Sequence, residues 1–360
     1  MSKAAPARSW SSRFAALVFA CALLALASGA FSPSSRAAPQ AFLGNNAGQV
    51  VGAEFDGRSV SNLDKSVAFY KILGFTEVPG VDKSWRNDPV MNRIHGTKGV
   101  ESRMAKFTIN ANFGQQTPFT LYLREFRGIK RRNVMAGKTA WEPGSTHFEV
   151  VVPDVDKLWS DLKAANMLWP RSWGGNLIPL PGQTKGTVAY ITDPDGMDIE
   201  IIQQRPAVPA TDGRPARPAD PPGFNHVGLV ILDPEKAEAF YGSLLGAQMP
   251  ATPTQWLSGD FMDSAVGGHG NILRMFNGTF ALAADHDARM RFEIVEYENR
   301  KKPVAPYDIT DIDPLVARLK GAGMTIVSDG IVEMKGGYRV ALVRDPDVHA
   351  FVELYEPPKK

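Results

Sequence analysis

Cysteine is almost absent from this chain of 360 residues, which holds a single one, Cys21. With one thiol the chain can form no internal disulfide, so a small fold held together by disulfide bonds is excluded. The fold must therefore depend on an apolar core, and a hydrophobic content of 44% is sufficient to build one.

Long runs of positive charge are also missing. The chain has 40 Lys and Arg against 38 Asp and Glu, and its basic clusters at 130–132 and 300–302 are short. Such clusters are usually solvated turns, so the composition gives no reason to expect a nucleic acid partner.

The N-terminal apolar run, from Phe14 to Ala27, is shorter than the roughly 20 residues that a membrane-spanning helix needs. Three basic residues precede it and small residues follow at 28–30, which is the pattern of a secretory signal peptide. We therefore predict a signal peptide at 1–30, cleaved after Ala30 or alternatively Ala38, and a disordered lead-in at 31–48. The mature protein is expected to be secreted or periplasmic and not anchored in a membrane.

The rest of the chain contains an internal repeat. Many residues of 56–104 recur at a constant offset of 171 in 227–275, and 147–166 resembles 304–323 at a different constant offset. The matched pairs at the offset of 171 are Lys65 with Lys236, Phe69 with Phe240, Tyr70 with Tyr241, Met91 with Met262, Gly99 with Gly270, and Arg103 with Arg274. The chain is thus predicted to contain four units in the order A, B, A, B.

Each unit has the sequence pattern βαβββ. A strand-like run precedes an Asn or Asp that can cap a helix, and each helical pattern ends near a Gly or Asn that suits a left-handed backbone. The capping residues are Asn62, Asp154, Asp233 and Asp311, and the terminating residues are Gly74, Asn166, Gly246 and Gly321 or Gly323. The fold class is therefore α+β. A proline-rich spacer at 205–222 separates a first domain, 49–204, from a second, 223–357.

Units two and four each end in a predicted hairpin with an Asp-Pro-Asp turn: ITDPDGMDIEII at 191–202 and LVRDPDVHAFVEL at 342–354. Successive side chains of a strand point to opposite faces. Ile199 and Ile201 should therefore face a core, while Glu200 faces whatever the other side of the sheet encloses.

The hairpins, together with FNHVGLVILDPEKAEAFYGSLLG at 224–246 and THFEVVVPDVDKLWSDLKAANM at 146–167, resemble the vicinal oxygen chelate superfamily. That superfamily includes glyoxalase I, extradiol dioxygenases, methylmalonyl-CoA epimerase, and bleomycin and fosfomycin resistance proteins. The resemblance implies that βαβββ units pair into two cup-shaped mixed sheets. It also implies that one divalent metal, such as Zn, Ni, Fe or Mn, binds on a concave face to His and Glu from the first and last strands of the units.

The resemblance places the ligand positions on these residues: Phe55 and Tyr122 in unit one, His147 and Glu200 in unit two, His226 and Glu293 in unit three, and Val304 and Glu353 in unit four. If units two and three pair, one cup collects His147, Glu200, His226 and Glu293. If the units pair in line, as in extradiol dioxygenases, the second cup holds His226, Glu293 and Glu353. We favour the first arrangement, because it explains why unit one lacks both ligands.

Together with the predicted signal peptide, the resemblance implies an exported lyase or isomerase that acts on a small substrate with adjacent oxygens, with Glu293 or Glu200 as the catalytic base. A ring-cleaving dioxygenase and a binding protein of the resistance type are the alternatives. Arg103 and Arg274 could hold a substrate carboxylate, or each could pair with a structural acid. Glu149, on the same strand face as His147, is expected close to the ligands.

Overall fold

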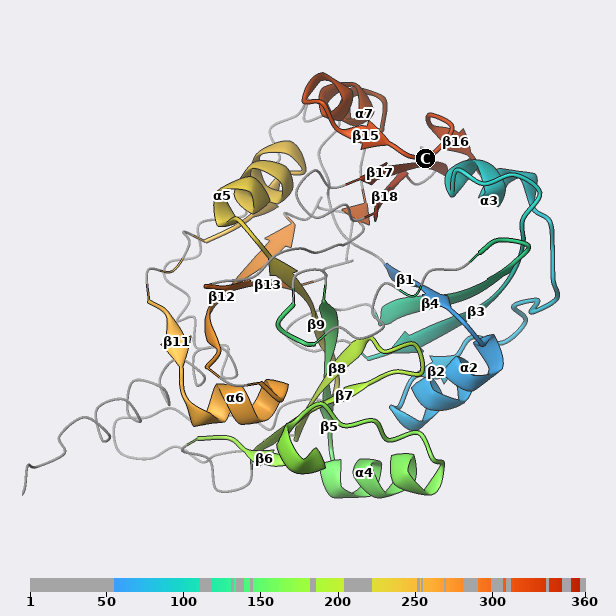
Figure 1. Cartoon of the computed structure of the whole chain (residues 1–360). Coiled ribbons are helices and arrows are strands. Elements are labelled where there is room, and N and C mark those ends of the chain that lie inside the picture. The colour runs from blue at the N-terminus through green and yellow to red at the C-terminus, as the bar shows by residue number, and fades with distance from the viewer. Residues whose placement is uncertain are drawn as a thin grey trace, which may run out of the picture.

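The computed structural model describes residues 55–110, 118–130, 133, 139–142, 145–181, 186–203, 222–250, 253, 255–268, 270–280, 291–298, 307–308, 312–334, 337–344 and 351–356 (Figure 1). The predicted signal peptide and lead-in, and all but the last residue of the predicted spacer, lie outside these residues and stay predictions. Within the described part, no helix combines the length and the apolar character needed to cross a membrane.

Unit one forms a sheet of its own with the strand order β1-β4-β3-β2. Its elements are β1 (Phe55–Val60), α2 (Leu63–Ile72), β2 (Thr76–Glu77), α3 (Pro89–Ile94), β3 (Glu101–Ile109) and β4 (Phe119–Arg127). The predicted cap is present, because the side chain of Asn62 accepts a hydrogen bond from the Lys65 backbone at 2.9 Å. Gly74, with φ of 96°, follows the end of the helix in the left-handed conformation.

Units two and three share one continuous sheet with the order β10-β12-β13-β9-β5-β8-β7-β6, to which β11 adds beside β12. Unit two supplies β5 (Thr146–Val152), α4 (Val155–Ala164), the 3₁₀ turn η1 (Trp173–Gly175), β6 (Ile178–Pro179), β7 (Thr187–Thr192) and β8 (Asp198–Gln203). Unit three supplies β9 (Gly223–Ile231), α5 (Pro234–Ala237), the π-helix η2 (Glu238–Leu244), β10 (Ala247–Gln248), β11 (Leu257–Ser258), α6 (Asp260–Val266), β12 (Ile272–Phe280) and β13 (Arg291–Tyr297).

Strands β5 and β9 lie antiparallel at the centre of this sheet, so unit two is hydrogen-bonded to unit three. This is the arrangement that the sequence analysis favoured, and we call it the crossed pairing. The predicted domains 49–204 and 223–357 are segments of the sequence. The central sheet contains strands from both of them.

Unit four forms a third sheet, ordered β14-β18-β17-β15, with β16 paired to β17. Its elements are β14 (Tyr307–Asp308), α7 (Ile312–Gly321), β15 (Thr325–Ile326), β16 (Val332–Glu333), β17 (Arg339–Arg344) and β18 (Phe351–Glu356). In the described residues this sheet and that of unit one are separate. The two units meet where Ile94 of α3 packs with Val332 and Val340.

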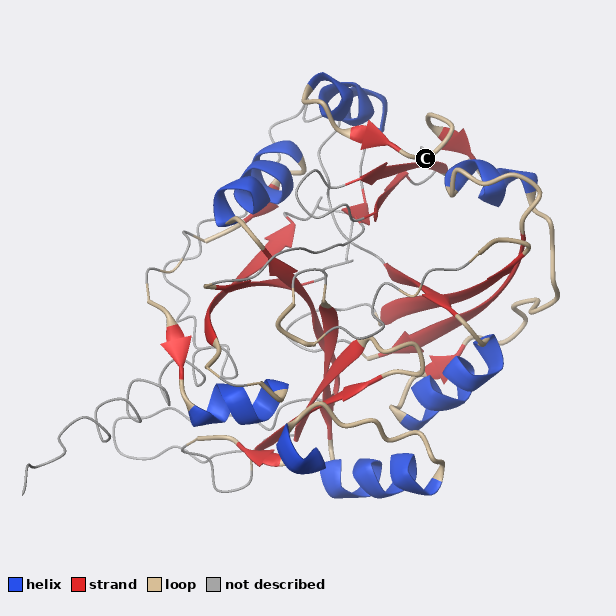
Figure 2. Ribbon diagram, viewed as in Figure 1, coloured by secondary structure: helices blue, strands red, loops and turns tan. Residues whose placement is uncertain are grey.

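The helices lie around the outside of the molecule and the strands lie inside (Figure 2). One apolar cluster joins all four units, and it includes Phe69, Leu162, Phe240 and Leu319 from the four main helices. Ile199 and Ile201 of β8 belong to the same cluster, as the strand alternation predicts. The face that carries Glu200 is therefore turned away from this core.

The two A units repeat their strand register as well as their sequence. Gly57 pairs with Tyr122 in unit one, and Gly228 pairs with Glu293 in unit three at the same offset of 171. The predicted repeat is thus reproduced in hydrogen-bonded strand partners, and equivalent positions of the two units can be compared directly.

Candidate metal centre

Four neighbouring strands of the central sheet each direct one potential ligand to the same face. These are Glu293 on β13, His226 on β9, His147 on β5 and Glu200 on β8. The Nε2 atoms of the two histidines lie 3.1 Å apart. The Glu200 Oε2 atom lies 3.5 Å from the His147 Nε2 atom, and three of the four side chains, His147, Glu200 and His226, form a compact group of donors.

Glu293 completes the set. Its Oε2 atom lies 3.5 Å from Nε2 of His226 and 3.6 Å from Nε2 of His147. The two histidines and Glu293 are each 6% exposed or less. The structure thus brings together all four residues that the crossed pairing predicts as ligands.

A β-bulge at Asn225 sets the direction of His226. Glu149 is the register partner of His226 and Val150 that of Phe224, so Asn225 is the extra residue of β9. Phe224 consequently faces the apolar core while His226, two residues later, faces the ligand cluster. Without the bulge, residues two apart on a strand would point to the same side.

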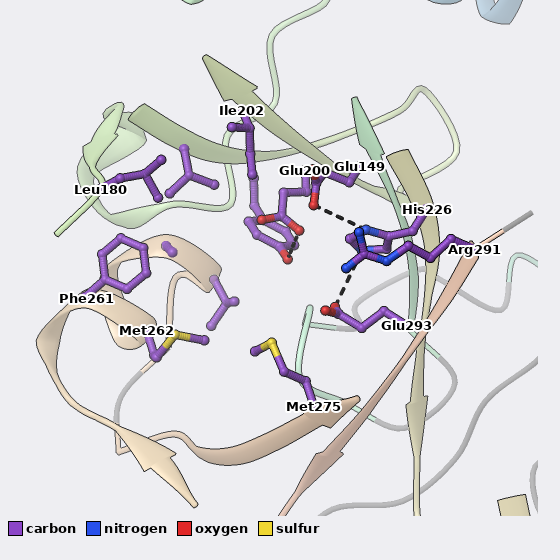
Figure 3. A pocket seen from close by; sticks show the side chains of 14 residues that line it. Glu149, Leu180, Glu200, Ile202, His226, Phe261, Met262, Met275, Arg291 and Glu293 are labelled. Carbon is purple, nitrogen blue, oxygen red and sulfur yellow. Dashed lines mark hydrogen bonds and ion pairs between the residues drawn. The ribbon is translucent and has the colours of Figure 1, made fainter. Parts of the chain in front are cut away.

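Glu149 lies behind His226, as expected from its position beside His147. Its Oε2 atom is 3.2 Å from Nδ1 of His226 (Figure 3), and its other oxygen accepts a short hydrogen bond from the Asn225 side chain. A carboxylate beside Nδ1 favours the tautomer that leaves Nε2 free to bind a metal.

Tyr190 of β7 is a second supporting residue. Its hydroxyl donates a hydrogen bond of 2.6 Å to Oε2 of Glu200, and its ring lies edge-on to His147 at a centroid distance of 5.6 Å. It therefore contacts one ligand of each type within unit two.

The buried cluster separates the charge states of the two carboxyl groups. Burial, reinforced by the charge of Glu149, raises the pKa of Glu200 to about 8. Burial also acts to raise the pKa of Glu293, but the charge and hydrogen bond of His226 outweigh it and lower that pKa to about 2. At neutral pH Glu200 is therefore protonated and Glu293 is ionised.

The two imidazoles also differ. Burial, together with the charge of His226, lowers the pKa of His147 to about 3, so this ring is neutral. For His226, burial acts to lower the pKa, but the carboxylates of Glu293 and Glu149 outweigh it and raise the pKa above its usual value. His147 thus presents a lone pair, and His226 binds a proton more readily than His147 does.

A pocket opens beside the cluster (Figure 3), where Glu200, His226 and Glu293 line it, and most of its remaining wall is apolar. Helix α6 closes one side, and β7, β8, β12 and Leu180, which follows β6, supply further apolar side chains. The apolar lining consists of Leu180, Val188, Ile202, Phe261, Met262, Ala265, Val266 and Met275. Arg291 is the one Arg or Lys among the described lining residues, and it donates to Asn277 at 2.9 Å and to Asn225 at 3.3 Å.

The ligand positions of unit one hold an aromatic pair. The rings of Phe55 and Tyr122 meet edge-on with their centroids 5.1 Å apart. In unit four, Glu353 belongs to β18 in a separate sheet, so its backbone is not part of the central sheet. Its side chain and Val304 lie outside the described part of the chain.

Arg103 and Arg274 are placed in ion pairs and not in the pocket. Arg103 pairs with Glu125 at 2.7 Å, and Arg274 pairs with Glu296 at the equivalent position of unit three. Each guanidinium also lies over an equivalent tryptophan, Trp85 or Trp256. Ala105 and Phe107, on the same strand face as Arg103, belong to the core. Of the two roles predicted for these arginines, the structure thus shows pairing with a structural acid. Strand alternation directs both side chains away from the concave face.

Sequence reasoning missed Tyr190, Arg291 and Asn225. Tyr190 and Ile191 are neighbours on β7 and therefore face opposite sides, and Ile191 pairs with Ile199 across the hairpin. The strand pattern could thus have assigned Tyr190 to the face of Glu200. Arg291 lies two residues before Glu293 on β13 and could have been found in the same way. The role of Asn225 depends on the bulge, for which the sequence carries no comparable signal.

The donor set fits a divalent metal. Two ligand atoms that are each about 2.1 Å from one ion lie about 3 to 3.5 Å from each other, and the cluster has separations of 3.1, 3.5 and 3.6 Å. Imidazole and carboxylate together suit Zn, Ni, Fe or Mn. The geometry therefore defines a class of protein in which two βαβββ units pair edge to edge around a candidate metal centre.

The chain belongs to the glyoxalase/bleomycin resistance protein/dioxygenase superfamily, whose profile matches residues 55–201 and 223–352. It is 31% identical to lactoylglutathione lyase GLX1 of Arabidopsis thaliana over 194 residues, a match that covers 53% of each chain. It thus spans about half the length of that relative. It is 29% identical over 160 residues to a probable lactoylglutathione lyase of Vibrio parahaemolyticus, covering 43% of this chain and 91% of the other.

Among solved structures the chain is similar to glyoxalase I of Zea mays, with a TM-score of 0.50 and 19% identity, covering 85% of this chain and 92% of that one. At this identity the likeness concerns the fold alone. It agrees with the predicted α+β class and the repeated units.

Proposed function

We propose that this protein is an exported, metal-dependent lyase or isomerase of the glyoxalase type that acts on a small substrate with adjacent oxygens. The observation that carries the proposal is the convergence of His147, Glu200, His226 and Glu293 beside an apolar pocket. The lactoylglutathione lyases among its relatives support the same reaction class.

A divalent metal held by these four residues would polarise the substrate oxygens and acidify the neighbouring C–H bond. The chain supplies the groups that orient the donors. Glu149 lies at Nδ1 of His226, and the Tyr190 hydroxyl donates to Glu200. The apolar wall from α6 keeps water away from one side of the site.

In the metal-free chain the two carboxyl groups of the cluster differ in pKa, which decides their charge before the metal binds. Glu293, with its pKa lowered to about 2, is ionised and can accept a proton. Glu200, with its pKa raised to about 8, is protonated in the metal-free chain and loses that proton when it becomes a ligand. Once the ion is bound, either carboxylate, Glu293 or Glu200, is a candidate for the base that moves the substrate proton.

A ring-cleaving dioxygenase is the second candidate. The compact group of His147, Glu200 and His226 is a set of two histidines and one carboxylate, which is typical of non-haem Fe(II) oxygenases. Metal analysis separates the two functions, since stoichiometric iron would favour the oxygenase and Zn or Ni the lyase or isomerase.

The proposal is tested by measuring the metal content of purified wild type, His226→Ala and Phe55→Ala by elemental analysis. We expect about one divalent ion per wild-type chain and loss of the ion from His226→Ala, because an Nε2 donor is removed. Phe55→Ala alters the equivalent position of unit one, where an aromatic pair stands, and should retain the ion. Equal metal content in the two variants would contradict the proposed centre.

A further inference from the structure

Unit one has no usual ligand at either ligand position, yet it packs against the strands that carry the two histidines. Its contacts reach β5 and β9 on the face opposite to the metal centre. Thr146 and Phe148, the neighbours of His147 on β5, face unit one, while His147 faces the ligand cluster.

Arg58 of β1 makes the contacts with β5. Its Nη1 atom donates a hydrogen bond of 3.1 Å to the hydroxyl of Thr146, and its guanidinium lies 4.3 Å from the ring centroid of Phe148. Asp56, which is 4% exposed, forms an ion pair with the same guanidinium. Arg58 therefore holds the residue before His147 and the residue after it, and is itself fixed by a buried carboxylate.

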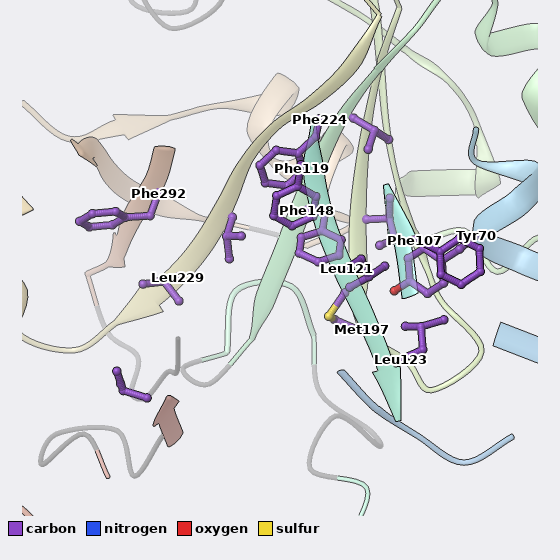
Figure 4. Packing of buried hydrophobic residues seen from close by; sticks show 14 of the residues in the cluster. Tyr70, Phe107, Phe119, Leu121, Leu123, Phe148, Met197, Phe224, Leu229 and Phe292 are labelled. Carbon is purple, nitrogen blue, oxygen red and sulfur yellow. The ribbon is translucent and has the colours of Figure 1, made fainter. Parts of the chain in front are cut away.

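Phe119 of β4 makes a second contact, and this one joins both histidine strands. Its ring stacks on Phe224 of β9 at a centroid distance of 3.6 Å and meets Phe148 of β5 edge-on at 5.7 Å (Figure 4). The backbone N–H of Phe224 also donates to the Asn110 carbonyl of unit one at 2.8 Å. These contacts lie next to the bulge that directs His226 into the cluster.

Side chains held on the back of a strand limit how far the strand can twist or shift, and so they fix the direction of the ligand on its front. A shift of less than about 1 Å at His147 would separate donors that now lie 3.1 to 3.6 Å apart. Groups that orient metal ligands without touching the metal typically change metal affinity about 10- to 100-fold when removed.

We propose that unit one is a brace for the metal centre and that Arg58 is its main positioning residue, aligning His147 through Thr146 and Phe148. This inference rests on the proposed function for the identity of the bound ion. The alignment of the two imidazoles, in contrast, is a property of the metal-free chain and can be measured without a metal.

The test compares Arg58→Gln with Arg103→Gln. Arg103 is the matched control, because it also lies in unit one, pairs with an acid and stacks on an aromatic ring, but its own contacts are with other residues of unit one. The first measurement is Co(II) titration followed by the visible d–d bands, which report ligand geometry. We expect Arg58→Gln to raise the Co(II) dissociation constant about 10-fold and to shift the bands, and Arg103→Gln to change neither.

The second measurement is made on metal-free protein. The imidazole nitrogen NMR signals of His147 and His226 are assigned among the six histidines of the chain by His147→Gln and His226→Gln. Arg58→Gln should shift the signals of both rings, whereas Arg103→Gln should leave them in place. A purely structural role for Arg58 would lower thermal stability without this selective effect.

Arg58→Gln leaves the buried Asp56 carboxylate without its ion-pair partner and could unfold the chain. Thr146→Val therefore serves as a second variant, because it removes only the hydroxyl that Arg58 contacts and keeps the branched shape. It should shift the same signals in the same direction by a smaller amount.

The brace is refuted if folded Thr146→Val and Arg58→Gln give wild-type histidine signals, or if Arg103→Gln produces the same shifts. A wild type that binds no Co(II), but whose histidine signals move in the Arg58→Gln variant, would refute the proposed metal-dependent function and support the brace.

Discussion

At the scale of single residues, the site depends on what surrounds each carboxyl group. Glu200 and Glu293 occupy equivalent positions of their units, yet their pKa values lie on opposite sides of neutrality. Glu200 is close to the negative charge of Glu149, whereas Glu293 is hydrogen-bonded to His226. The sequence predicts both as ligands, but their charge difference arises from neighbours that come from other strands.

This difference predicts proton release on metal binding, because a carboxylate must be deprotonated to act as a ligand. At about pH 7 the pKa of about 8 keeps Glu200 protonated, so the wild type should release about one proton more than Glu200→Gln. Above about pH 9 Glu200 is already ionised, and the difference should vanish. Calorimetric titration with Zn²⁺ in buffers of different ionisation enthalpy counts the protons. An equal count for both proteins at about pH 7 would contradict the assigned charge state.

At the scale of elements, the centre requires two strands to approach without a side chain between them. Gly228 of β9 is the register partner of His147 on β5. A Cβ atom at Gly228 would lie 1.9 Å from Cε1 of His147, so the imidazole occupies the space that any other residue would fill. At Gly57, the equivalent residue of unit one, an added Cβ atom would have no neighbouring atom within 4 Å.

Gly228→Ala should therefore displace the His147 ring and weaken metal binding by at least about 10-fold, the scale of change seen when ligand orientation is disturbed. Gly57→Ala is the matched control and should bind metal as the wild type does, because its added methyl group meets no neighbour. Both dissociation constants are measured by competition with a chelating dye. Wild-type affinity in folded Gly228→Ala would show that the ring does not need this space.

The strands and their faces were predictable because they follow from local periodicity. Ile199 and Ile201 lie in the core and Glu200 faces the donors, as alternation requires. The bulge at Asn225 was not predictable, since an unpaired strand residue is defined only by its partner strand. The wall that Ala265 and Val266 of α6 build over unit two is likewise a contact between distant segments.

At the scale of the whole molecule, the order of pairing decides where the centre forms. Four similar units permit crossed or in-line pairing, and the repeat alone does not distinguish them. The loss of both ligands from unit one did favour the crossed arrangement, and β5 and β9 are indeed partners. The contact between units one and four through α3, with Arg93 3.2 Å from Asp329, could not be inferred from the repeat.

The acid stability of the whole chain should depend on His95, which follows α3 at this contact between units one and four. Burial, together with the charge of Arg124, lowers the pKa of His95 to about 4, and its ring meets Phe126 edge-on at 5.2 Å. The unfolded chain takes up the proton near the ordinary value of 6.5, whereas the folded chain does not do so until about pH 4. The contribution of neutral His95 to the free energy of unfolding is therefore complete above about pH 6.5 and is lost as the pH falls towards about 4.

Between about pH 7 and about pH 5 this linkage should lower the free energy of unfolding by about 2 kcal/mol. His95→Gln, which cannot be protonated, should reduce the loss by that amount. Urea unfolding of both proteins at the two pH values gives the comparison, and the difference between the two losses removes any effect of the substitution that is independent of pH. Equal losses in the two proteins would mean that His95 is protonated as readily in the folded chain as in the unfolded one.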